Sequence, residues 1–291
     1  MVKEMSIPGT HSFEQIATLA SERVKAGKKL RTALISGGAK QGIEVFARAV
    51  KAGLIEPMVV GSREATDEAI RQSALSSVEM VSVNDTDAAV KAAFQLAIQH
   101  KIDMIFADES VSDVVVGEIG KAESGFVAKG RVASGVAVIK PQKYPKLLFL
   151  SDCAVNAAPD LKSKLGVIQN IVNVARSLEI ENPRVAVLAK MAERRQIKGA
   201  LVDGPLSFDV AMDEFAATSK GITQSPVAGQ ADAFLAPNVE VAAGVYSALS
   251  LFGSCERGSV IPGGAVPVAI TMRTDTADEM LNSLYLGILT A

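Results

Sequence analysis

The segment whose side chains are best suited to binding or catalysis runs from Thr271 to Asp275, directly after the apolar stretch 267–270. It places Arg273 between hydroxyl and carboxyl side chains at the end of an expected strand. A guanidinium can bond two oxygens of one phosphate at once, and the N-terminus of a following helix adds positive potential. The pattern therefore favours recognition of a phosphate group by Arg273.

Glu279 follows that segment and has two interpretations. Thr276 with Glu279 three residues later fits the capping box that begins many helices. A carboxylate near a phosphate site could also act as a general base. The spacing favours the cap over the catalytic role.

A second polar segment, 151–160, follows the apolar run 146–150. In open α/β sheets, ligands bind outside the carboxyl ends of the strands. Asp160 is expected to cap the long amphipathic helix 160–179. For Asp152, a turn and a role in ligand binding are equally open, and Asn156 lies in the same segment.

A third polar segment, 203–209, follows the short apolar run 200–202. Its Gly-Pro pair forces a stiff turn, and Asp209 is expected to cap a helix. Such a turn could also lay Asp203 and Ser207 along a cleft.

The elements that must position these residues alternate along the chain. Short β-branched runs predict strands at 31–36, 57–61, 78–83, 103–107, 135–139, 146–150, 184–188, 200–202, 233–236 and 266–270. Helical stretches separate most of them, which is typical of βαβ units and a mostly parallel sheet. We predict an α/β protein with a domain change near residue 128. Residues 1–127 and 266–291 would form one domain, and 128–265 the other.

Composition narrows the classes of partner. With 48% hydrophobic residues the chain can bury a sizeable core, which excludes a disordered chain. The net charge is only −2, so neither a nucleic-acid footprint nor a polybasic membrane patch is expected. No apolar run is long enough for a membrane span, and the N-terminus lacks a signal core, which favours a cytoplasmic protein. Two cysteines and two histidines leave almost no material for a metal site or a Ser-His triad.

Four segments together resemble the phosphate acetyl/butyryltransferases, namely 151–160, 202–209, 225–232 and 267–275. The resemblance is dense from about Arg131 onwards and is closest to the butyryl type. It implies two three-layer α/β domains, as in isocitrate and isopropylmalate dehydrogenases, with the active site in the cleft between them. It also implies interconversion of acyl-CoA and phosphate with acyl phosphate and CoA, in a homodimer or larger assembly. Coenzyme A is then a substrate, with neither a metal nor a bound redox cofactor.

The same resemblance assigns roles to individual residues. Arg273 and Thr271 would hold the phosphate or the carbonyl oxygen. Ser134 corresponds to the family's serine before an apolar strand. Glu279, or less favourably Asp275, would be the carboxylate near the thiol.

The phosphates of CoA need cations, and two groups are candidates. The first is Arg131, and the second is the basic cluster Lys190–Lys198. These side chains could bind the phosphates of CoA, or they could simply be exposed, solvated charges, and both interpretations are equally open. The remaining expected substrate-binding residues are polar, namely Asp152, Asn156, Asp203 and Ser207.

Several positions depart from the butyryl-type pattern. Asp108 follows a strand after which relatives carry Lys-Gly, Met272 replaces a serine, and Ala242-Ala243 replaces Gly-Asn. A longer loop after Leu188 is missing. The alternative to an active acyltransferase is therefore a weakened or altered relative that keeps a CoA or acyl-phosphate binding cleft. A nucleotide-binding dehydrogenase of the related fold is disfavoured by the glycine spacing in the segment 36–42.

Overall fold

The computed structural model describes residues 9–27, 29–73, 75, 78–188 and 197–291. The strands are β1 Leu30–Ser36, β2 Ile55–Gly61, β3 Glu79–Ser82, β4 Met104–Ala107, β5 Val136–Lys140, β6 Leu148–Ser151, β7 Arg184–Val187, β8 Leu201–Asp203, β9 Ala233–Leu235, β10 Glu256–Ile261 and β11 Val268–Ile270. The α-helices are α1 Phe13–Ala26, α2 Lys40–Lys51, α3 Arg63–Gln72, α4 Thr86–Ile98, α5 Ser112–Ile119, α6 Leu161–Ser177, α7 Phe208–Met212, α8 Glu214–Ser219, α9 Val239–Phe252 and α10 Ala277–Thr290.

The described strands form one continuous sheet in the order β3-β2-β1-β4-β11-β10-β5-β6-β9-β7-β8. Most neighbours are parallel, and β10 runs antiparallel to both β11 and β5. The predicted α/β fold class is confirmed, and the predicted strands are present. Only β10 escaped prediction, because Glu256–Ile261 reads as charged residues, glycine and serine before its apolar end.

Helices cover both faces of this sheet. On one face, α1, α2, α6 and α10 pack into a core that runs along both halves of the molecule. On the other face, α4 and α5 cover one half, and α7–α9 cover the other. The helices of each group pack over a hydrophobic core of their own, so this face of the sheet has two separate cores.

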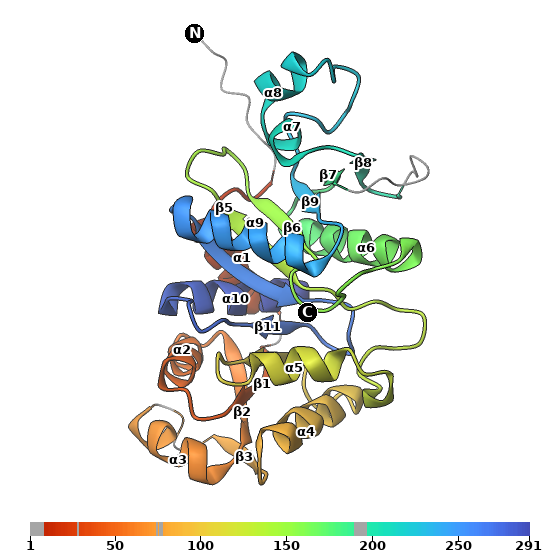
Figure 1. Ribbon diagram of the computed structural model, residues 1–291. Helices are drawn as coiled ribbons and strands as arrows, with labels where there is room; N and C mark the ends of the chain where they lie inside the picture. The colour runs from red at the N-terminus through yellow and green to blue at the C-terminus, as the bar shows by residue number, and fades with distance from the viewer. Residues whose placement is uncertain (1–8, 28, 74, 76–77, 189–196) are drawn as a thin grey trace.

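The last elements of the chain lie in the middle of the molecule. Strand β11 pairs in parallel with β4 on one side and antiparallel with β10 on the other. Figure 1 shows β11 and α10 between α3 and α4 at one end and α7 and α8 at the other. The sheet runs without a break through both halves, and the domain limits at residues 128 and 266 stay a prediction. No helix in the described part of the chain is long and apolar enough to cross a membrane.

Candidate active site

A cavity of about 440 Å³ follows the carboxyl ends of β4 and β11. We name it the Arg273 cavity. Its lining residues come from α5 and the turn before it, the start of β5, the loop after β6, strand β10, and the end of β11 with the segment that follows it. They are Glu109, Ser112, Asp113, Val116, Gly135, Val136, Ala137, Cys153, Ala154, Ser259, Ile270, Thr271, Met272, Arg273 and Thr274. The cavity thus lies outside the carboxyl ends of two central strands, the place where open α/β sheets commonly bind ligands.

Arg273 is the available cation of this cavity. Its side chain is exposed, and it makes neither a hydrogen bond nor an ion pair with any residue that the structure describes. Its neighbour Thr271 is buried, and the Thr271 hydroxyl donates to the carbonyl oxygen of Ala107 at 3.0 Å. The Thr271 carbonyl in turn accepts from the Ser112 hydroxyl at 2.6 Å. Thr271 therefore fixes the strand end, while the guanidinium of Arg273 stays open to a ligand.

A buried ionic cluster supports the segment that carries Arg273. Asp275 Oδ2 accepts from the backbone N–H of Met272 at 2.8 Å, and its Oδ1 lies 3.3 Å from Arg257 Nη2. Arg257 also donates to the carbonyl of Thr274 at 3.2 Å. Burial raises the pKa of Asp275, and the Met272 N–H and Arg257 oppose that shift. Asp275 therefore shapes the loop and does not line the Arg273 cavity.

Glu279 belongs to the same cluster and begins α10. Its Oε2 accepts from the Thr276 N–H at 2.7 Å, and its own N–H donates to the Thr276 hydroxyl at 3.3 Å, a complete capping box. Glu279 Oε1 lies 3.3 Å from Arg257 Nε. In the described structure Glu279 faces a different groove, between α1 and α10. The expected cap is present, and the catalytic role of Glu279 stays a prediction.

Asp152 organises the loop after β6. Its Oδ1 accepts from the backbone N–H groups of Gly135, Ala154 and Val155 at 2.8, 2.9 and 3.0 Å. Its Oδ2 accepts from the N–H of Asn156 at 2.9 Å. The Asn156 amide donates to Asp152 and to the carbonyl of Ala133. These bonds hold Cys153 and Ala154 in the cavity wall, so Asp152 and Asn156 act on the cavity through its backbone.

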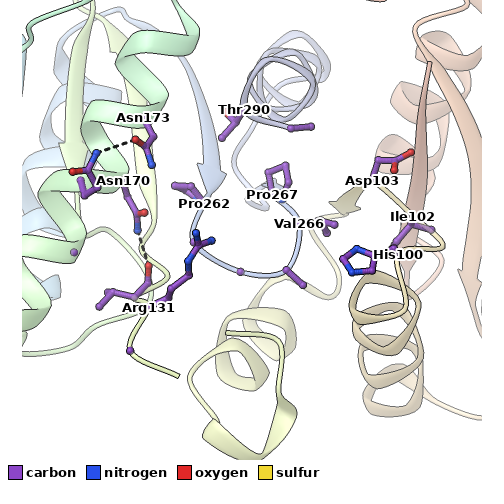
Figure 2. Close-up of a pocket in the computed structure, with 18 of the residues that line it drawn as sticks. His100, Ile102, Asp103, Arg131, Asn170, Asn173, Pro262, Val266, Pro267 and Thr290 are labelled. Atoms are coloured by element: carbon purple, nitrogen blue, oxygen red, sulfur yellow. Dashed lines mark hydrogen bonds between the residues drawn. The ribbon is translucent and has the colours of Figure 1, made fainter. Parts of the chain in front are cut away.

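The structure places Arg131 away from Arg273, and it buries Ser134 beside Gly135, a residue that lines the Arg273 cavity. Ser134 is fully buried, and its hydroxyl accepts from the Asn170 amide at 2.9 Å. Arg131 lines a larger cavity of about 780 Å³ at the amino ends of β1, β4 and β11, together with His100 and Asn173 (Figure 2). Arg273 follows the opposite, carboxyl end of β11. The structure therefore does not bring Arg131 and Arg273 into one site.

Asp203 and Ser207 are farther still. Asp203 ends β8, the edge strand, and five strands separate it from β11. Six strand spacings of about 4.8 Å amount to about 29 Å. Asp203 Oδ1 accepts from the Gly204 N–H at 2.9 Å, and Ser207 donates to Asp209 at 2.6 Å. These residues build the turn into α7 and lie away from the Arg273 cavity.

Asp108 is a buried carboxylate that directly precedes Glu109, a lining residue of the Arg273 cavity. It is fully buried, and its Oδ1 accepts from the Ser110 N–H at 2.9 Å. Burial raises its pKa to about 6. Gly42, in the first turn of α2, packs on it so closely that an added Cβ would lie 2.5 Å from the Cβ of Asp108. Gly42 therefore leaves the space that Asp108 occupies, and burial disfavours the charged form of its carboxyl group.

The structure describes some of the other positions that depart from the butyryl-type pattern, and it leaves others undescribed. Met272 lines the Arg273 cavity, Ala242 is buried in α9, and Ala243 lines a neighbouring cavity. The missing loop after Leu188 and most of the cluster Lys190–Lys198 lie outside the described residues. No group of three or more metal-ligating side chains occurs within the described ranges.

Sequence reasoning missed several residues of the site. Glu109, Ser112 and Asp113 line the cavity directly after β4. The rule that pointed to the ends of other strands applies here equally and would have found them. The sequence offered no comparable reason to select Arg257, because this residue lies within β10, the strand that the hydrophobic pattern did not predict.

The fold and this cavity define an α/β protein with an arginine poised for an anion at the end of a central strand. The family model described as "Phosphate acetyl/butaryl transferase" matches residues 124–288, more than half of the chain. The phosphate butyryltransferase of Clostridium acetobutylicum is 32% identical over 92% of this chain and 96% of its own length. The chain therefore belongs to the phosphate acetyl/butyryltransferase family.

Two other relatives bear on the same assignment. The phosphate acetyltransferase of Rickettsia typhi is 28% identical over 89% of this chain and 80% of its own length. The crystal structure of a phosphotransacetylase from Streptococcus pyogenes aligns with a TM-score of 0.74 at 17% identity, covering 96% of this chain and 98% of that one. The structural likeness supports the fold. The family resemblance, the fold class and the class of enzyme predicted from the sequence are confirmed.

Proposed function

We propose that this chain transfers an acyl group between coenzyme A and inorganic phosphate at the Arg273 cavity. The observation that carries the proposal is the unpaired, exposed guanidinium of Arg273 in a cavity at the carboxyl end of β11. The first turn of α5 also lines this cavity through Ser112 and Asp113, and a helix N-terminus favours an anion. Membership of the family supplies the reaction type.

The reaction needs a held phosphate and a stabilised oxyanion. A phosphate oxygen attacks the thioester carbonyl, a tetrahedral intermediate forms, and the carbon–sulfur bond breaks to release CoA as a thiolate. Arg273 would hold the phosphate through two oxygens and stabilise the negative charge that grows on the former carbonyl oxygen. In the reverse reaction the CoA thiolate attacks the carbonyl carbon of the acyl phosphate, and the bond from that carbon to the phosphate oxygen breaks to release inorganic phosphate.

Cys153 lines the cavity without serving as the nucleophile in this proposal. Its Sγ donates to the carbonyl oxygen of Leu150 at 3.3 Å, and burial raises the pKa of its thiol. A thiol with a raised pKa is a poor nucleophile near neutral pH. Direct transfer between CoA and phosphate therefore fits the cavity better than a covalent cysteine intermediate.

The activity has a direct test. Purified protein with acetyl-CoA or butyryl-CoA should release free thiol only when phosphate is present. Thermal stabilisation by CoA without thiol release would instead identify a binding module, and the absence of both would overturn the proposed function.

We also propose that the protein is a cytoplasmic homodimer that associates through α9. This helix is apolar along its length, yet only Ala242 and Tyr246 are buried, while Leu251 and Phe252 are 75% and 82% exposed. An apolar helix face of this kind is typical of a contact between identical chains. Light scattering should give about twice the 30.4 kDa mass of the chain, and Phe252→Asp should lower it. A parent protein of single-chain mass at micromolar concentration would contradict the dimer.

A further inference from the structure

The cavity of about 780 Å³ at the amino ends of β1, β4 and β11 is not used by the acyl transfer proposed above. We name it the Arg131 cavity. Its lining comes from the segment between α4 and β4, the segment before β5, one face of α6, and the loop between β10 and β11. Its volume lies within the range of about 300–1,000 Å³ that is typical of small-molecule sites.

Two cations of this lining are available to a ligand. Arg131 and Lys162 are exposed, and neither side chain makes a hydrogen bond or an ion pair with any residue that the structure describes. Val132 packs on Gly166, one helical turn after Lys162, where an added Cβ would lie 2.7 Å from the Cβ of Val132. This contact brings Arg131 to the same end of α6 as Lys162. A guanidinium and an ammonium group placed together suit a phosphate group.

A pair of amide side chains lies farther along the same face of α6. Gln169 Nε2 donates to Asn173 Oδ1 at 3.0 Å. The Gln169 carbonyl oxygen and the Asn173 amino group make no hydrogen bond with any residue of the described ranges, and both residues line the cavity. They offer an acceptor beside a donor, which matches the edge of adenine that carries an amino group beside a ring nitrogen. The pair lies about 10–16 Å along the helix axis from Lys162, a separation comparable with that between the phosphate and the base of a nucleotide.

The wall opposite α6 is mainly apolar. Figure 2 shows Arg131 and the amides of α6 on one side of the cavity, with Ile102 and Val266 on the other. Asp103 is the acidic side chain of this wall, and it pairs with Arg31 at 2.7 Å. A flat base can therefore pack on apolar surface while its edge meets the amides.

We propose that the Arg131 cavity is a regulatory site for a free adenine nucleotide, whose phosphate binds Arg131 and Lys162. The base lies along the amide pair of α6. This site is separate from the Arg273 cavity, which lies at the opposite, carboxyl end of β11. Binding of the nucleotide is independent of the proposed acyl transfer, whereas the regulation rests on it.

The segment 131–135 connects the two cavities. Asn170 of α6 donates to the carbonyl oxygen of Val132 at 2.9 Å. Gly135, at the other end of the segment, lines the Arg273 cavity. A ligand that binds both Arg131 and α6 thus acts on a segment that also forms part of the wall of the reaction site. Such a continuous set of contacts is the physical basis for coupling between the two sites.

Titration calorimetry with adenosine monophosphate (AMP) tests the binding. We expect a Kd below about 1 mM for the parent protein, and binding weaker by about tenfold or more in Arg131→Ala and in Lys162→Ala, because each loses a charge-assisted contact to the phosphate. Lys129→Ala is the matched control and should bind like the parent, because Lys129 is exposed near Arg131 and does not line the cavity. Adenosine, which lacks the phosphate, should give no measurable heat. Ribose phosphate, which lacks the base, should bind more weakly than AMP by about tenfold or more.

Three results would contradict the binding site. AMP that binds Arg131→Ala and Lys162→Ala as well as it binds the parent occupies another place, and the proposal is then wrong. An equal loss in Lys129→Ala would show a general effect of surface charge. Ribose phosphate that binds as tightly as AMP would remove the role of the base.

Thiol release from butyryl-CoA at saturating AMP tests the regulation. We expect kcat/KM to change by about fivefold or more in the parent and to stay unchanged in Arg131→Ala. An unchanged rate in a parent protein that binds AMP would overturn the regulation and leave the binding site intact. Absence of thiol release without AMP would overturn the proposed acyl transfer and the regulation with it, while calorimetry still decides whether the nucleotide binds.

Discussion

Two loops in this molecule are built around a buried aspartate, and they differ in what they leave unpaired. In the loop 151–156, Asp152 accepts hydrogen bonds from four backbone N–H groups, and Asn156 is also bonded on its side chain. In the loop 271–276, Asp275 binds Met272 and Arg257, and Arg273 projects from the loop with no partner in the described structure. In the first loop these polar side chains stabilise the backbone. In the second loop the guanidinium of Arg273 stays available to bind a ligand.

The comparison teaches that polar residues at strand ends must be sorted by the bonds they already make. Both loops follow strands and carry the same kinds of side chain, so sequence motifs mark both as sites. A carboxylate with several backbone donors stabilises the fold, and its replacement should affect unfolding more than turnover. An unpaired guanidinium should show the opposite pattern.

The largest effect on stability is expected at Asp152. Replacement by alanine leaves the N–H groups of Gly135, Ala154, Val155 and Asn156 without their acceptor, and each unsatisfied buried group costs about 1–3 kcal/mol. Because some of these donors can reach water, we expect Asp152→Ala to lower the free energy of unfolding by about 4 kcal/mol. Urea denaturation measures this. A loss below about 1 kcal/mol would show that the loop holds itself without the carboxylate.

Arg257→Met should have the next largest effect. It leaves the buried carboxylate of Asp275 without its cation, and removing one partner of a buried ion pair costs about 3–5 kcal/mol. Because Asp275 keeps its bond from the Met272 N–H, we expect a loss of about 3 kcal/mol, at the lower end of that range. Asp275→Asn in the same chain should recover part of this loss, because no unpaired charge then remains. Urea denaturation of both single variants and of the double variant gives the coupling free energy between Arg257 and Asp275. Strictly additive losses in the free energy of unfolding would contradict a direct pair.

Asp108 should show a dependence on pH. Its folded pKa is about 6 against an ordinary value of 3.8, so the folded state binds the proton more tightly than the unfolded state. Stability is therefore lost as the pH rises from about 4 to about 6, by at most about 3 kcal/mol, and the penalty is constant above that window. Asp108→Asn should be more stable than the parent at pH 8, with a gain that disappears near pH 4. An equal difference at both values would contradict the shifted pKa.

Glu279→Gln is expected to have the smallest effect on stability. Glutamine keeps the capping-box bond to the Thr276 N–H and loses only the charge that faces Arg257. We expect a loss of about 1 kcal/mol. Turnover within twofold of the parent would make Glu279 a cap alone, whereas a large loss of turnover at nearly unchanged stability would make it the base.

The sequence predicted the architecture well because β-branched runs and amphipathic stretches depend on local patterns. It did not reveal β10, whose glycine and charged residues form a strand only because β11 and β5 lie on either side. Arg257 was missed with it. Asp203 and Ser207 were chosen as site residues from their motif, but the order of strands in the sheet places them at the far edge. That order is decided by tertiary packing, which a local pattern does not contain.

Arg273 was expected just after a strand, and it does follow the end of β11, because the end of an apolar run is a local feature of the sequence; its role in the site stays a prediction. Arg131 shows the limit of the same reasoning. Both arginines are exposed near β11 and the loops around it, yet they lie at opposite ends of that strand. Only a structure distinguishes the two.

The most direct test of this account is therefore a paired measurement on Arg273→Ala and Arg131→Ala, using phosphate-dependent thiol release from butyryl-CoA. Loss of a charge-assisted contact that strengthens in the transition state should lower kcat/KM about a hundredfold in Arg273→Ala and raise the KM for phosphate. Arg273→Lys should recover little, because an ammonium cannot bond two oxygens in the same geometry. Arg131→Ala should stay within about threefold of the parent. Parental kinetics in a folded Arg273→Ala, with the loss found in Arg131→Ala instead, would contradict the assignment of the active site to the Arg273 cavity.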